Sequence, residues 1–397
     1  MRHLIALVVL LTALAGPAAA QPAPWEPERL DAGWIVRPSV VFGGMWDSNA
    51  TLRNDPTNAD PEIAELVGIV NPRGQIDFNG KRAKFSAGYS GRLETYSTLD
   101  NLSRYDQRAR VDASYQMTQR VSFDTRHQLT SSPSTEQLDL GGVPFTRVGS
   151  RMMTSSGGVT SDLTRRLKLR TGYAFQWVDF DRDPRFQRLR GGHQHSPSAE
   201  LTYAISSRLD LGASWFYHHA SIDGAEEVID TQTAEAVVSY TVGPDTKVHG
   251  TAGVAHLNVR DTRETRTGPS YGASLSHQIH PVSFDVGYDR AFIPSFGFGG
   301  MTAKQEVHAR VHVPLAHGRM FAAGGVTYRR TTPVLASSFP IELSSYWTNA
   351  TFGYAIARWL RVETFLNMNN QTSSAQGNVD RTRIGVQFVT SKPMRIQ

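Results

Sequence analysis

Charged side chains recur at every second position along several short stretches of this chain. One such series is Asp106, Arg108, Arg110 and Asp112. Carboxylates and guanidiniums in this arrangement can form ion pairs that stiffen a wall, or act as fixed charges that select among passing ions and solutes. Catalysis would need a nucleophile or a water-activating carboxylate held beside a histidine, and no motif fixes such a group. The sequence therefore predicts a charged surface and no enzyme.

A strand with two different faces explains this spacing. In residues 104–117 the charges alternate with Tyr105, Val111 and Tyr115. Successive side chains of a β-strand point to opposite faces, so the charges share one face and the apolar residues share the other. The charged face is too polar for a dry core, because unpaired buried charges are costly. We expect this face to line a water-filled lumen and the apolar face to meet lipid.

Two sets of residues follow from this alternation. The predicted lumen-lining charges are Arg37, Lys84, Arg92, Glu94, Asp106, Arg108, Arg110, Asp112, Asp124, Arg126, Lys168, Arg170, Lys304, Glu306, Arg361, Glu363 and Arg383. The aromatic residues predicted to form girdles at the two membrane interfaces are Trp34, Tyr89, Tyr105, Tyr115, Trp177, Tyr203, Tyr217, Tyr240, Tyr271, Tyr288, Tyr346 and Tyr354.

The pattern continues over residues 33–390 with no helical interruption. It predicts an all-β, single-chain, antiparallel transmembrane β-barrel of about 18 strands, within a range of 16–18. Short turns, such as those at Thr118-Gln119 and Ser206-Ser207, alternate with long connections such as 131–150. Several strands begin just after a basic turn residue, as at Arg120, Arg166 and Arg208. The alternation predicts short periplasmic turns and long extracellular loops, with both termini in the periplasm.

The ends of the chain and its composition limit the remaining possibilities. Residues 1–20 read as a signal peptide cut after Ala20, 21–32 as a short periplasmic segment and 391–397 as a tail after the barrel. The 397 residues include no cysteine, which excludes disulfides and thiolate metal sites. The 41 basic and 36 acidic residues are mixed, and without a basic cluster we expect no nucleic-acid partner. A mean hydropathy of −0.34 still fits a barrel, since only alternate residues touch lipid.

Turn positions also predict which charges face each other across strands. A hairpin centred at Gln119 places Asp112 opposite Arg126, and a bend near Asn101 places Glu94 opposite Arg108. His193 and His195 share one strand face, a spacing that could hold a divalent metal, but no third ligand is evident. We therefore predict no metal and no cofactor.

Some segments of the sequence resemble a known protein family. The chain resembles the beta-barrel porin 2 family of outer-membrane proteins in three features. They are the stretch from Val40 to Asn49, the stretch from Tyr96 to Asn101 and the strands that begin with Arg-Leu just after a turn. The resemblance implies a bacterial outer-membrane location and no catalytic residue. Members of that group often accompany exopolysaccharide or capsule export, which implies a periplasmic polysaccharide-export partner. The stretch from Arg383 to Val389 resembles the last-strand signal read by the barrel-assembly machinery.

Three functions remain open at this point. The first is an exit pore for an exopolysaccharide or capsular glycan. The second is a general or anion-preferring diffusion porin, in which a long loop such as 131–150 folds inward as the constriction. The third is a structural or adhesive barrel whose loops do the binding.

Overall fold

The structure is a computed structural model that describes residues 33–53, 62–138, 140–182, 189–224, 227–279, 281–335, 341–374 and 377–396. The predicted signal peptide (1–20) and periplasmic segment (21–32) lie outside the described residues. Within them, no helix is long and apolar enough to cross a membrane.

Nineteen strands and three short 3-10 turns make up the described chain. The strands are β1 Gly33–Asp47, β2 Glu65–Asn79, β3 Ala83–Tyr96, β4 Arg104–Gln116, β5 Val121–Ser132, β6 Ser150–Asp162, β7 Leu167–Phe180, β8 Gly192–Ala204, β9 Leu209–Ile222, β10 Glu227–Gly243, β11 Thr246–Val259, β12 Thr265–Ile279, β13 Val282–Pro294, β14 Met301–Leu315, β15 Met320–Pro333, β16 Leu343–Ala357, β17 Leu360–Ser373, β18 Gly377–Ser391 and β19 Met394–Ile396. The 3-10 turns are η1 Asp100–Leu102, η2 Thr135–Gln137 and η4 Ala316–Gly318.

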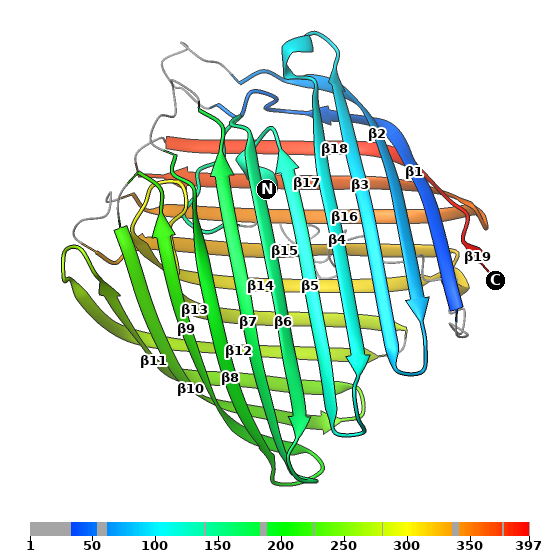
Figure 1. The fold of residues 1–397 in the computed structure, drawn as a ribbon. Helices are drawn as coiled ribbons and strands as arrows, with labels where there is room; N and C mark the ends of the chain where they lie inside the picture. Colours follow the sequence, from blue (N-terminus) through cyan, green and yellow to red (C-terminus); the bar gives the residue numbers. More distant parts are fainter. Residues whose placement is uncertain are drawn as a thin grey trace, which may run out of the picture.

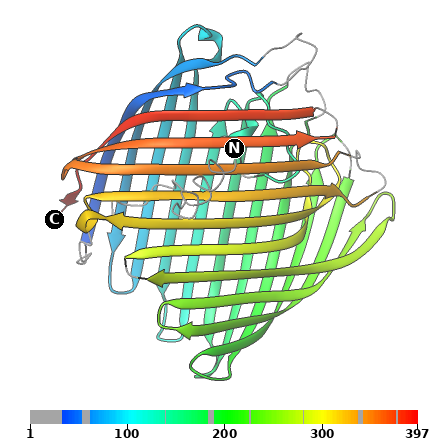
Figure 2. The ribbon, with the colours of Figure 1, turned by 180° about the vertical axis from the view of Figure 1, so that it is seen from behind.

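The strands form one closed antiparallel sheet. Each strand from β2 to β17 pairs with its two neighbours in the chain, and β1 pairs with both β2 and β18. Figure 1 shows β1 to β9 as the near wall, with β10 to β18 crossing behind it, and Figure 2 shows the same closure from the other side. The prediction of an all-β antiparallel barrel of about 18 strands is confirmed.

Pairing continues past residue 390, where the sequence placed the end of the barrel. After Lys392 and Pro393, β19 pairs with the first residues of β1, so that Trp34 lies opposite Ile396. This part of β1 extends beyond the end of β18. Without β19, the backbone N–H and C=O groups on that edge of β1 would have no strand to pair with.

The connections alternate in length as predicted. A short turn joins each even-numbered strand from β2 to β16 to the strand that follows it. The longer connections, including 97–103, 133–149 and 295–300, all lie at the opposite end of the barrel. Both described termini are at the short-turn end, which is the periplasmic end in bacterial outer-membrane barrels.

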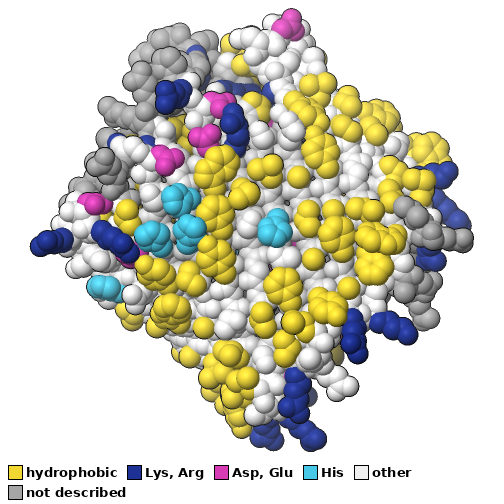
Figure 3. All heavy atoms as spheres, in the orientation of Figure 1, with side chains coloured by type: hydrophobic (Ala, Val, Ile, Leu, Met, Phe, Trp, Pro, Cys, Tyr) yellow, Lys and Arg dark blue, Asp and Glu magenta, His cyan; other side chains and the backbone are white. Residues whose placement is uncertain are grey.

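The two faces of the wall differ as the alternation requires. In β1, Phe42 and Trp46 are exposed on the outside, whereas Val41, Met45 and Asp47 are buried on the inside. Figure 3 shows hydrophobic side chains spread over the outer face of the near wall. An apolar exterior on a closed barrel is the property that lets strands span a membrane, and this is the architecture of bacterial outer-membrane barrels.

The predicted girdle aromatics all lie at outward positions. Trp34, Tyr115, Tyr203, Tyr240 and Tyr354 are exposed near the short-turn ends of their strands. Tyr105, Trp177, Tyr217, Tyr271 and Tyr346 lie toward the long-loop ends, and Tyr89 and Tyr288 lie between the two groups. The Tyr89 and Tyr105 hydroxyls are 2.9 Å apart. Phe123, Tyr173, Trp215 and Tyr328 are further exposed aromatics that the sequence reading did not include.

Candidate functional site

The inner face of β4 to β7 carries a chain of ion pairs. Asp112 accepts hydrogen bonds from Arg110 and, at 2.7 Å, from Arg126. Arg170 donates to Asp124 at 3.1 Å. Arg126 remains 64% exposed in this pair, so water reaches the wall here. Ion pairs as exposed as these contribute little to stability, and their charges remain available to solutes in the lumen.

Further predicted lining charges lie on the inner faces of these and other strands. Lys304 contacts Asp289 at 2.8 Å and Glu306 at 3.7 Å, and Glu306 also accepts a 2.5 Å bond from Arg329. The remaining positions are as follows: Arg37 pairs with Asp77, Arg92 with Glu94, Asp106 with Ser132, Lys168 with Asp162, Arg361 with Glu363 and Arg383 with Glu136, while Lys84 and Arg108 are exposed at the same strand parity.

One predicted register is right and another is wrong. Asp112 lies opposite Arg126, as the turn at Gln119 requires. Glu94, however, lies opposite Arg104 and not opposite Arg108. The connection between β3 and β4 contains the 3-10 turn η1, which begins right after Leu99 and moves the centre of the bend toward β3. Because the register is set by this centre, the pairing shifts by whole residue pairs.

The described residues of the connection between β5 and β6, 133–138 and 140–149, fold into the lumen, and we call them the inward loop. The backbone N–H of Phe145 donates to Gln371 Oε1 at 2.6 Å, and Gln371 Nε2 donates to the carbonyl of Val143 at 3.1 Å. The Phe145 ring also meets Trp347 edge-on at 5.6 Å. Since Gln371 and Trp347 belong to β17 and β16, the loop reaches the wall opposite its own strands.

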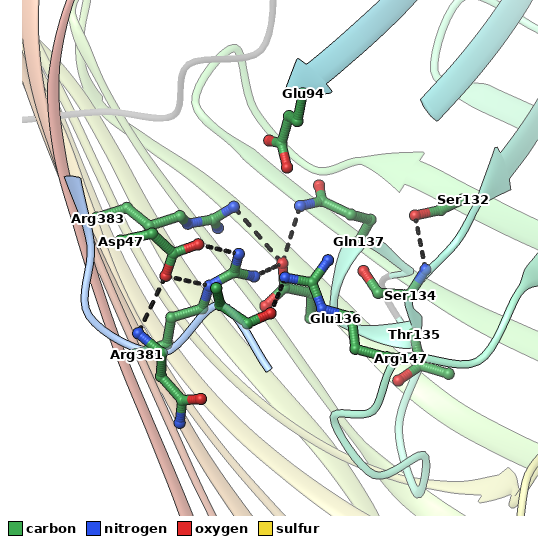
Figure 4. A network of polar contacts seen from close by, with 12 residues as sticks. Asp47, Glu94, Ser132, Ser134, Thr135, Glu136, Gln137, Arg147, Arg381 and Arg383 are labelled. Atoms are coloured by element: carbon green, nitrogen blue, oxygen red, sulfur yellow. Dashed lines mark hydrogen bonds and ion pairs between the residues drawn. The ribbon is translucent and has the colours of Figure 1, made fainter. Parts of the chain in front are cut away.

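A buried ion cluster fixes the start of the inward loop. Its members, which we call the anchor cluster, are Asp47, Glu94, Arg104, Glu136, Arg381 and Arg383. Figure 4 shows Glu136 pointing from η2 toward Arg381 and Arg383 on β18. Arg381 also donates to Asp47 on β1, and the Arg381, Asp47 and Glu136 side chains are 0% exposed. The cluster therefore joins the loop to the seam where β1 meets β18.

Several guanidiniums surround the Glu136 carboxylate. Burial alone would raise its pKa, but Arg381, Arg383 and Arg104 together hold the pKa of Glu136 well below its usual range. Arg147, at the end of the inward loop, adds to this field and donates to Tyr96 Oη at 2.9 Å. The same guanidiniums therefore favour the ionised carboxylate, which holds the ion cluster together.

Apolar packing holds the rest of the loop. Leu138, Leu140, Val143 and Val148 form a buried cluster with Met152, Val178, Phe180 and Phe296. Gly142 has a φ of +76°, and a Cβ there would press on Ser295 in the connection between β13 and β14. Glycine is needed at such a position because other residues rarely adopt positive φ and because the neighbour is so close. The loop-end half of the lumen is thus packed around the inward loop.

A second group of arginines lies on β2, β3 and β17. Arg73 interacts electrostatically with Arg92, Arg361 and the single carboxylate of Glu363. The Glu363 carboxylate also forms an ion pair with Arg361 and accepts a 2.7 Å hydrogen bond from Gln387 Nε2. Among the described residues, Arg73 Nε has no hydrogen-bond partner although it is buried. This group can offer positive charge to an anion in the lumen.

The sequence reading missed much of the anchor cluster. Arg381 and Arg104 share the strand parity of Arg383 and Asp106, so alternation alone could have identified them. Asp47 is the last residue of β1, and the sequence analysis did not include it among the lining charges. Glu136 and Arg147 lie in a loop, where no alternation of apolar and polar residues predicts which way a side chain points. Only the fold brings Glu136 to Arg381, 245 residues later in the chain.

The histidine pair lies outside the lumen. His193 and His195 face outward, with ring centroids 5.4 Å apart, and His195 is 6.4 Å from His219. Figure 3 shows histidine side chains gathered toward one edge of this outer face. Across the described residues, no group of three or more His, Cys, Asp or Glu side chains is placed to hold a metal ion.

Neither a scan against protein-family models nor a search of curated proteins finds a match. The resemblance to the beta-barrel porin 2 family therefore stays a prediction. Among solved structures, OccAB4 of Acinetobacter baumannii aligns with a TM-score of 0.46 and 9% identity, covering 93% of this chain and 100% of that one. The outer membrane protein OpdK of Pseudomonas aeruginosa aligns with a TM-score of 0.44 and 13% identity, covering 90% and 99%. A mutant of the Pseudomonas aeruginosa ferric enterobactin receptor gives 0.46 and 10%, covering 91% and 81%. At these values no family and no solute is assigned to the chain.

Proposed function

We propose that the protein is an outer-membrane diffusion channel for small polar solutes, narrowed by the inward loop. The observation that supports this most directly is the attachment of the loop to the opposite wall through Phe145 and Gln371 and through the anchor cluster. A loop held at both places reduces the cross-section of the lumen without closing the charged half below it. This favours the diffusion-porin hypothesis over the other two.

The glycan-exit hypothesis requires a different lumen. A long flexible polysaccharide needs a wide, wet path along the whole barrel. Here the inward loop would have to leave its site, breaking the buried contact between Glu136 and Arg381 and the apolar cluster around Val143. Breaking a buried ion pair costs about 3–5 kcal/mol. Glycan export, with its periplasmic partner, remains a prediction from the family resemblance alone.

The lining suggests a modest preference for anions. Arg73 and Arg361 share the carboxylate of Glu363, while the neighbouring Arg92 pairs with Glu94, so this level of the lumen carries excess positive charge. Fixed charges in a narrow passage raise the local concentration of ions of opposite sign. We infer that small anions pass more readily than cations of equal size.

A swelling assay separates the two transport hypotheses. Liposomes containing the purified barrel are diluted into iso-osmotic solutions of a monosaccharide, of a series of longer oligosaccharides, and of a linear glycan fragment of many sugar units. A channel narrowed by the inward loop predicts swelling that falls steeply with sugar length. Equal swelling rates for the monosaccharide and the long glycan would contradict the proposal and favour the exit pore.

A further inference from the structure

The turns at the short-turn end of the barrel carry almost only positive charge. Eight basic residues lie in the described turns between strands, and Asp245 is the single acidic residue among them. The basic residues are Lys81, Arg82, Arg120, Arg165, Arg166, Arg208, Arg319 and Arg358, and all eight are exposed. Figure 3 shows Lys and Arg side chains protruding at this end of the near wall. The diffusion channel described above gives these charges no role, since they lie in the turns, beyond the strand residues that line the lumen.

Three consecutive hairpins repeat the same four-residue turn. The sequences are Met117-Thr-Gln-Arg120, Leu163-Thr-Arg-Arg166 and Ile205-Ser-Ser-Arg208. In each, the hydroxyl at the second position accepts hydrogen bonds from the backbone N–H of the arginine and of the next residue, at 2.9–3.1 Å. Such hydroxyl turns fix the backbone locally. The arginine therefore leaves the barrel from an equivalent point on each hairpin.

The three turns are also tied to their neighbours. The carbonyl oxygens of Arg120, Arg166 and Arg208 each accept a 2.8 Å hydrogen bond from a backbone N–H of the next hairpin. Neighbouring strands lie about 4.8 Å apart, so arginines on successive hairpins are spaced by about 10 Å along the rim. We call Arg120, Arg166 and Arg208 the arginine row. It is a regular line of charges on a rigid edge.

An apolar side chain accompanies each arginine. Met117, Leu163 and Ile205 begin the three turns and are 46–52% exposed. No ion pair joins any arginine of the row to a carboxylate in the described part of the chain. A turn that holds both an exposed aliphatic residue and a guanidinium without an ion pair, at the end of a lipid-facing wall, suits the boundary between acyl chains and phosphates.

We propose that the arginine row binds the anionic headgroups of phospholipids in the periplasmic leaflet of the outer membrane. The aliphatic residues enter the acyl region, and the guanidiniums form charge-assisted hydrogen bonds with phosphate oxygens. The occupant is a lipid rather than a soluble solute because each charge is paired with an exposed apolar side chain. The row would fix the depth of this side of the barrel in the membrane. This inference is independent of whether the lumen conducts.

The test uses the whole purified barrel and phosphatidylglycerol as the probe. Native mass spectrometry counts the phosphatidylglycerol and phosphatidylcholine molecules retained from mixed micelles. We expect selective retention of phosphatidylglycerol, and a loss of affinity of about fivefold for each charge removed in the variant R120Q/R166Q/R208Q. The variant R120K/R166K/R208K keeps the charges and should retain most of the binding.

Arginines at the other end of the barrel provide the matched control. Arg151, Arg260 and Arg330 are exposed but paired with Asp181, Asp230 and Glu342, so R151Q/R260Q/R330Q should leave lipid retention unchanged. Heat-modifiable gel mobility checks that each variant is folded. The proposal is overturned if wild-type protein retains the two lipids equally, or if the control loses as much phosphatidylglycerol as the row variant. A row variant that keeps full retention overturns it as well.

Discussion

At the scale of single residues, Glu136 is the side chain on which the position of the inward loop depends most. It is fully buried, and its charge is offset by Arg381, Arg383 and Arg104. Glutamine has nearly the same shape without the charge. In Glu136→Gln these guanidiniums lose their shared counter-ion, and we expect unfolding to become easier by about 3–5 kcal/mol. The urea midpoint of unfolding in detergent measures this change.

Glu342 offers the matched control for that substitution. It pairs with Arg330 at 3.1 Å, but both side chains are about half exposed. Exposed pairs contribute about 0–1 kcal/mol, so Glu342→Gln should leave the urea midpoint nearly unchanged. Equal midpoints for the two variants would show that the anchor cluster does not hold the loop.

The pH dependence of the same contact has a definite sign. The pKa of Glu136 is depressed in the folded protein, so its ionisation stabilises the fold above the ordinary glutamate pKa and is lost only as pH falls through the lower folded value. The difference in urea midpoint between wild type and Glu136→Gln should therefore stay constant from about pH 8 to pH 5 and narrow only below about pH 4. A difference that already disappears between pH 7 and pH 5 would contradict this reading.

At the scale of elements, the seam between β1 and β18 depends on a glycine. A Cβ at Gly43 would overlap the carbonyl oxygen of Val386, whereas the nearest atom to a Cβ at Gly44 is Val67 O at 3.8 Å. Gly43→Ala should force the seam apart at a cost of about 1–3 kcal/mol. Gly44→Ala should be close to neutral. The temperature at which the heat-modifiable band shifts in a gel compares the two variants, and equal temperatures would refute the role of the seam.

Strands and loops differ in how far sequence alone predicts them. The alternation of Tyr105, Val111 and Tyr115 with charges is a local pattern, so strand number and the faces of the wall could be read directly. The pairing of Glu94 with Arg104 could not, because it depends on the shape of a 3-10 turn. The destination of Glu136 lies beyond any local pattern, since its partner Arg381 belongs to the last long strand.

At the scale of the whole molecule, the distribution of charge decides what the channel favours. Arg73 lies in the group around Glu363, and its Nε has no partner among the described residues. Arg73→Gln should shift the reversal potential in a salt gradient toward cations. Arg330→Gln, which removes an exposed charge at the long-loop end, should leave the potential unchanged. A wild-type preference for cations would contradict the inferred role of the arginine group.

In the proposed channel the lumen conducts, and the inward loop narrows it. Single-channel recording in planar bilayers tests both parts with wild-type protein and Glu136→Gln. We expect steady openings of one size for wild type, and larger, noisier openings for the variant, because the loop is released from Arg381 and Arg383. A wild-type barrel that does not conduct, or a folded variant with the same conductance as wild type, would contradict the account.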